Sequence, residues 1–199
     1  MFPIRDDVPS SRFPVITWLL IGVNAVVFLF QLSLPPQGLQ QLFYLFGIVP
    51  ARFTDPEWAA YVGFPLRTFW PFLTSMFLHG GFLHILSNMW SLWIFGDNVE
   101  DRMGPFRFLA FYLASGAAAG VLHWLTNPAS TVPTVGASGA IAGVLGAYLL
   151  FYPRARVLTL VPLFFYPLFF YLPAIVYLGI WFLSQLFSGT FALASPQQS

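Results

Sequence analysis

A single serine at the start of an apolar segment is the residue of this sequence best suited to chemistry. Ser138 lies in the run Gly136-Ala137-Ser138-Gly139-Ala140, where all its neighbours are small. A serine hydroxyl presented in this way can act as a nucleophile when a base accepts its proton. The alternative is structural, because a serine among helix-packing glycines often bonds only to its own i−4 carbonyl.

A second group of polar residues precedes Ser138 in the chain. His84 and Asn88 are four residues apart in an otherwise apolar stretch. On a helix they share one face, about 6 Å apart along the axis, so that two N–H donors can point at one oxygen. Such donors stabilise an oxyanion, and the Ser138 backbone N–H at a helix N-terminus would add another. The structural alternative is a hydrogen bond between helices.

The composition predicts a protein that lies in lipid. Charged residues make up 8% of the chain, against about 25% in soluble domains. The chain has no cysteine and three histidines, so we expect no metal site, and no motif calls for a cofactor. The net charge is +1 and the basic residues are scattered arginines, which argues against nucleic acid as a partner.

Several segments are apolar enough to cross the hydrocarbon core, which is about 30 Å thick. We predict five spans, over residues 14–34, 74–95, 106–125, 136–152 and 172–187. The stretch 35–67 is interrupted by proline, glycine and charges, and is expected to form an interfacial hairpin or short in-plane helices. Pro162 and Pro167 interrupt residues 157–171 and leave the start of the fifth span open.

The spans divide the chain into three parts. Residues 1–13 are expected to form a cytoplasmic N-terminal segment, residues 14–189 a transmembrane domain, and residues 190–199 a polar tail or the start of a further loop. Small residues on the fourth span, at Gly139, Gly143 and Ala147, predict a close approach to a neighbouring helix.

The arginines predict how the protein is oriented. Loops on the cytoplasmic side of a membrane collect positive charge. With the N-terminus inside, Arg5, Arg12, Arg102, Arg107, Arg154 and Arg156 are cytoplasmic, whereas Arg52 and Arg67 lie outside. We therefore expect a multi-pass protein with a cytoplasmic N-terminus, with the bacterial inner membrane as the default location. His84, Asn88 and Ser138 then lie at a similar shallow depth.

Taken together, these motifs resemble those of the rhomboid family of intramembrane serine proteases. Residues 79–88 resemble the family's second-helix motif, residues 100–104 its signature after that helix, and residues 136–139 its nucleophile motif. The resemblance implies a rhomboid-like polytopic, all-α bundle with an interfacial loop after the first helix. It also implies that Ser138 is the nucleophile, that His84 and Asn88 line the oxyanion hole, and that His79 is structural.

The sequence departs from the family pattern at two places. Rhomboids complete a Ser-His dyad with a histidine on a sixth helix, and no histidine follows Ser138 here. His123 is the remaining candidate base, but it lacks small neighbours. We therefore expect a fragment with five of six helices, inactive by itself, of a serine endopeptidase that cleaves transmembrane protein substrates in the bilayer. Arg67 and Trp70 are also separated, where the family has an adjacent Trp-Arg pair.

Two other classes of function remain as alternatives. A non-catalytic rhomboid-like pseudoprotease that binds transmembrane clients would account for the missing histidine. A small transporter or channel would need ionisable residues in mid-span and inverted repeats, and the sequence shows neither.

Overall fold

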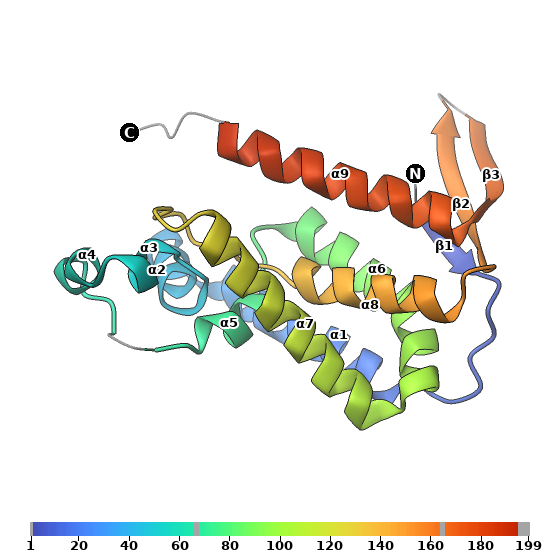
Figure 1. The fold of residues 1–199 in the computed structure, drawn as a ribbon, viewed down its shortest axis with the longest axis horizontal. Coiled ribbons are helices and arrows are strands. Elements are labelled where there is room, and N and C mark those ends of the chain that lie inside the picture. Colours follow the sequence, from blue (N-terminus) through green and yellow to red (C-terminus); the bar gives the residue numbers. More distant parts are fainter. Residues whose placement is uncertain (1, 66–67, 164–165, 195–199) are drawn as a thin grey trace. The chain divides into compact units, whose positions relative to one another are not determined.

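The computed structural model describes residues 2–65, 68–163 and 166–194, and the chain divides into two units. The first unit is Ser10–Val144, and the second combines Met1–Pro9 with Leu145–Ser199. Most of the described residues are helical, and Figure 1 shows the order of the elements.

The first unit is organised by α1 (Val15–Ser33), which packs against α6 (Phe82–Met103). Thr17, Asn24 and Gln31 are spaced seven residues apart on the otherwise apolar α1, and all three are buried. A spacing of seven is about two helical turns, so the three side chains lie on one face. Polar groups of an apolar helix face protein when they can find partners there.

Hydrogen bonds fix both ends of α1 to the region of α6. The buried Glu100 carboxylate accepts bonds from the backbone N–H groups of Ile16 (2.9 Å) and Thr17 (2.8 Å), and from the Thr17 hydroxyl (2.8 Å). It thereby caps amides that have no partner within the helix. At the other end, Gln31 Nε2 donates to the His79 carbonyl (2.7 Å), and Gln31 Oε1 accepts from the His79 N–H (3.0 Å). The two helices are therefore antiparallel.

Short helices fill the connection between α1 and α6. They are α2 (Pro36–Phe46), α3 (Ala51–Thr54), α4 (Pro56–Tyr61), α5 (Pro71–Thr74) and the 3-10 turn η1 (Ser75–Phe77). Short helices were one of the two forms expected for residues 35–67. They place η1 directly before the His79 loop.

Arg52 is a buried cation in this connection. Its guanidinium donates to the carbonyls of Leu45 (3.2 Å) and Pro65 (3.3 Å), and to the Thr68 hydroxyl. It also faces the Trp70 ring at 5.7 Å. An arginine and a tryptophan therefore do meet here, although Arg67, which the sequence suggested for this pair, lies outside the described residues.

The helices α7 (Pro105–Thr126) and α8 (Ser138–Phe151) complete the first unit, and the second unit begins within α8 at Leu145. A Cβ atom added at Gly139 would lie 2.5 Å from Ala119 Cβ, and one at Gly143 would lie 2.5 Å from Ser115 Cβ. The predicted close approach at these two glycines is confirmed, and α7 is the neighbour.

The second unit contains a sheet, so the prediction of an all-helical chain must be corrected to mostly helical. The antiparallel strands β1 (Phe2–Asp6), β2 (Arg156–Leu163) and β3 (Tyr166–Pro173) lie in that order, and α9 (Ala174–Ala194) follows β3 (Figure 1). Pro162 and Pro167 face each other across β2 and β3. Proline breaks a helix interior, whereas the β-branched and aromatic residues around it favour strands.

The helix boundaries agree best with the predicted spans at α1, α7 and α8. In contrast, α6 begins at Phe82 rather than at residue 74, because η1 and the Gly80-Gly81 pair interrupt the apolar run. Among the described helices, α1 and α7 are long and apolar enough to cross a membrane, and α8 and Ala174–Ser184 are shorter apolar segments. The count of five spans stays a prediction, and the predicted polar tail falls partly on residues 195–199, outside the described residues.

Glu100→Ala tests the cap on α1. The substitution removes a buried acceptor from three donors, and we expect a loss of roughly 2 kcal/mol or more in the free energy of unfolding. The matched variant Asp101→Ala removes an acceptor that pairs with exposed Ser11 and should cost much less. Thermal unfolding in detergent micelles measures both, and equal effects would contradict the assignment.

Candidate active site

The first turn of α6 presents the imidazole of His84 with a defined orientation. The Gly80 N–H donates to His84 Nδ1 at 3.4 Å, so the neutral ring carries its hydrogen on Nε2. A Cβ atom added at Gly136 would lie 2.6 Å from both Nε2 and Cε1 of His84. The N–H donor edge of His84 therefore faces Gly136, two residues before Ser138. The His79 ring packs edge-on against His84, with centroids 5.1 Å apart.

Asn88 supplies a second donor one turn further along α6. Its side chain is buried, and Nδ2 has no hydrogen-bond partner among the described residues. The same atom would lie 3.8 Å from a Cβ atom at Gly136. A buried N–H group without a partner costs free energy and calls for an explanation. Among the buried unpaired side-chain atoms described, Asn88 Nδ2 is distinguished by its position at Gly136, beside Ser138.

Gly136 lets the chain pass close to these donors. Its φ of +129° is open to glycine and strained for other residues. Its N–H donates to the Ser75 carbonyl at 2.9 Å, which ties the segment before α8 to η1. Ser138 follows as the first residue of α8 and is half-buried. The structure thus brings Gly136, two residues before Ser138, close to His84 and Asn88, and the catalytic roles of Ser138, His84 and Asn88 stay predictions.

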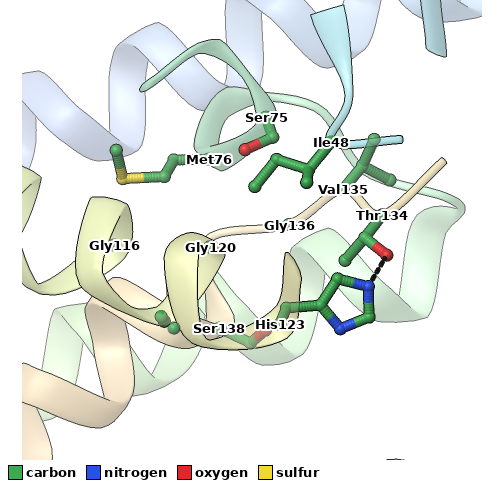
Figure 2. A pocket seen from close by; sticks show the side chains of 12 residues that line it. Ile48, Ser75, Met76, Gly116, Gly120, His123, Thr134, Val135, Gly136 and Ser138 are labelled. Atoms are coloured by element: carbon green, nitrogen blue, oxygen red, sulfur yellow. Dashed lines mark hydrogen bonds between the residues drawn. The ribbon is translucent and has the colours of Figure 1, made fainter. Parts of the chain in front are cut away.

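A cavity of about 210 Å³ adjoins this segment (Figure 2). Ser138 and Gly136 line it, together with Ser75, Met76 and residues of the facing helix α7. The cavity can hold several waters or a small group beside the Ser138 side chain.

His123 lines the same cavity, but its ring is engaged by neighbours. Nε2 lies 2.8 Å from the Thr134 hydroxyl (Figure 2), and Nδ1 lies 3.4 Å from Asn127 Nδ2. Thr134 also exchanges backbone hydrogen bonds with Ile48 at 2.9 Å and 2.8 Å. His123 therefore holds the loop that leads to Ser138, and its candidacy as the base stays a prediction.

Sequence reasoning missed the residues that support the site. Gln31 fixes the His79 backbone, and Thr134 joins His123 to Ile48. The seven-residue spacing of the polar residues on α1 was a signal that could have identified Gln31. Thr134 left no comparable signal, because its partners are distant in sequence. Within the described residues, no three histidine or carboxylate side chains gather as a group that could hold a metal.

Comparison with known proteins agrees with the motifs. The family described as "Rhomboid domain" matches residues 66–195. The chain belongs to the rhomboid family and is accordingly an integral membrane protein.

Several curated relatives are similar over part of the chain. The putative rhomboid protease YdcA of Bacillus subtilis is 34% identical over 137 residues, which is 69% of this chain and 62% of that protein. Rhomboid-like protein 11, chloroplastic, of Arabidopsis thaliana is 31% identical over a region that covers 68% of this chain and 41% of the length of that protein. Rhomboid protease GluP of Bacillus subtilis is 42% identical over a region that covers 40% of this chain and 15% of the length of GluP. The chain thus spans less than two thirds of each relative.

Proposed function

We propose that this protein is an intramembrane serine endopeptidase in which Ser138 is the nucleophile and His84 and Asn88 form the oxyanion hole. The observation that carries the proposal is the buried Asn88 Nδ2, which has no hydrogen-bond partner among the described residues and lies next to the His84 N–H edge at Gly136. Two relatives bear the name rhomboid protease, which supports proteolysis in general. The substrates would be the transmembrane segments of other proteins.

The proposed reaction proceeds by acyl transfer. Ser138 Oγ attacks the scissile carbonyl, and the negative charge that develops on oxygen is met by Asn88 Nδ2, His84 Nε2 and the Ser138 backbone N–H. Each donor that is already oriented contributes about 3 to 4 kcal/mol to transition-state stabilisation. The amine then leaves with the proton that Ser138 gave up, and water hydrolyses the acyl-enzyme. The cavity beside Ser138 supplies room for that water.

The topology proposed for this enzyme has a cytoplasmic N-terminus and the active site near the outer surface of a bacterial inner membrane. Pairing of β1 with β2 supports it, since the N-terminal segment and the segment after α8 must then lie on one side of the membrane. Four crossings by α1, α6, α7 and α8 meet this requirement. Arg5, Arg154 and Arg156 are all on that side, as the charge rule expects.

The endopeptidase and the pseudoprotease differ in whether a base accepts the proton of Ser138. His123 is engaged by Thr134 and Asn127, and no histidine follows Ser138 in these 199 residues. In the endopeptidase, a histidine on a further helix would accept the proton. In the alternative, a pseudoprotease that binds transmembrane clients, no such residue exists, and Ser138 is structural.

Ser138→Ala distinguishes these functions in the protein isolated from its source membrane, whose intact mass shows whether further residues are present. With a transmembrane reporter in proteoliposomes, we expect the substitution to abolish cleavage. The control is Ser87→Ala, which replaces an exposed serine of α6. The Ser87→Ala protein should cleave the reporter as the wild type does. Cleavage by the Ser138→Ala protein would refute the proposal. If the wild type and the Ser138→Ala protein both bind the reporter and neither cleaves it, the pseudoprotease is favoured.

Gly136→Ala tests the geometry of the oxyanion hole. The added methyl would collide with the His84 ring, and the backbone conformation would be strained. Displacing a donor lowers kcat by about 100-fold or more. Gly146→Ala is the matched control, because a Cβ there meets no atom within 4 Å and alanine favours a helix. Equal cleavage rates for the two variants would show that Gly136 does not shape the site.

A further inference from the structure

The hairpin of β2 and β3 is apolar on both of its faces. Leu160 pairs with Phe169, and Thr159 pairs with Phe170. Paired residues point to the same face and successive pairs alternate, so the two phenylalanines lie on opposite faces. Phe169 is 57% exposed and Phe170 is 48% exposed. A strand at a protein–water boundary would instead alternate apolar and polar residues.

The charge pattern divides the hairpin into a polar base and an apolar outer part. No charged residue occurs from residue 157 to residue 173, and Tyr166 near the outer end is 76% exposed. Arg154 and Arg156, just before and at the start of β2, are exposed at the base. An apolar area of this kind marks a surface that meets protein or membrane.

The hairpin is joined directly to apolar helices, which indicates that lipid covers its apolar surface. β3 ends at Pro173 and α9 begins at Ala174 with no residue between them, and the apolar helix α8 ends at Phe151. The hairpin is therefore anchored at both ends to apolar helices of an integral membrane protein. Exposed aromatic residues above a pair of arginines are typical of the headgroup boundary, where aromatic rings collect and arginine meets anionic lipid.

The free edge of the sheet, at β3, is poorly suited to binding another protein. β3 is an outer strand of the sheet, but Pro167 and Pro173 have no N–H to donate to another strand. Prolines in an edge strand discourage pairing with a second copy or an extended peptide. An open edge is also excluded from the hydrocarbon core, so the hairpin belongs at its boundary.

We propose that the β2–β3 hairpin inserts its apolar outer part into the boundary between headgroups and acyl chains, with Arg154 and Arg156 at anionic headgroups. The inference rests on membership of the rhomboid family and on the packing of the hairpin. It does not depend on catalysis by Ser138.

Because the chain has no cysteine, single introduced cysteines can carry a spin label. Phe169→Cys and Phe170→Cys place the label on the two faces, and Arg154→Cys is the control at the base. The full chain is reconstituted in vesicles of phosphatidylcholine and phosphatidylglycerol. Collision rates with oxygen, which partitions into lipid, and with a water-soluble nickel chelate then report the depth of each label.

Both hairpin labels should collide several-fold more often with oxygen than with the chelate, relative to the control label. If a label at position 169 or 170 collides with the chelate as often as the label at position 154 does, the proposal is overturned. Protection from both reagents, with magnetic broadening between labels, would also overturn it, since a second copy would then cover the sheet. Where Phe169→Cys does not fold, Tyr171→Cys reports the same face. None of these readings involves cleavage, so they stand apart from the test of Ser138.

Discussion

A buried hydrogen-bonding group in an apolar protein needs a partner, and this requirement organises the first unit. Glu100 satisfies the free amides at the start of α1, and Gln31 satisfies both backbone groups of His79. These contacts determine how α1 lies against α6, and they place the loop before α6. His79 in turn packs against His84. The orientation of His84 thus follows from polar contacts made at the far end of another helix.

Asn88 is informative because it departs from this rule. Its carboxamide nitrogen is buried and has no hydrogen-bond partner in the part of the chain that the structure describes. It lies beside Gly136, where a side chain would collide with His84. A donor held in this way costs stability in the resting protein, and it is suited to an oxygen that carries negative charge only during reaction. The segment that leads to Ser138 is held by hydrogen bonds of Gly136 to Ser75 and of Thr134 to Ile48 and His123.

The parts of the fold that could be predicted are those encoded locally. Apolar length identified α1, α7 and α8, and the four-residue spacing of His84 and Asn88 placed both donors on one face. The β2–β3 hairpin was not predicted as a sheet, because a short apolar run fits a strand or a buried helix equally well. Its partner β1 lies at the other end of the chain, where no periodicity could reveal the pairing. The approach of Gly136 to His84 likewise joins residues about fifty positions apart, which no local pattern could reveal.

The most direct test of the account is to trap the proposed oxyanion. A fluorophosphonate that reacts with activated serines leaves a phosphoryl oxygen where the oxyanion would lie. A structure of the native membrane protein after this treatment should show the adduct on Ser138, with that oxygen within hydrogen-bond distance of Asn88 Nδ2 and His84 Nε2. An adduct on another residue, or one whose oxygen points away from Asn88, would contradict the account.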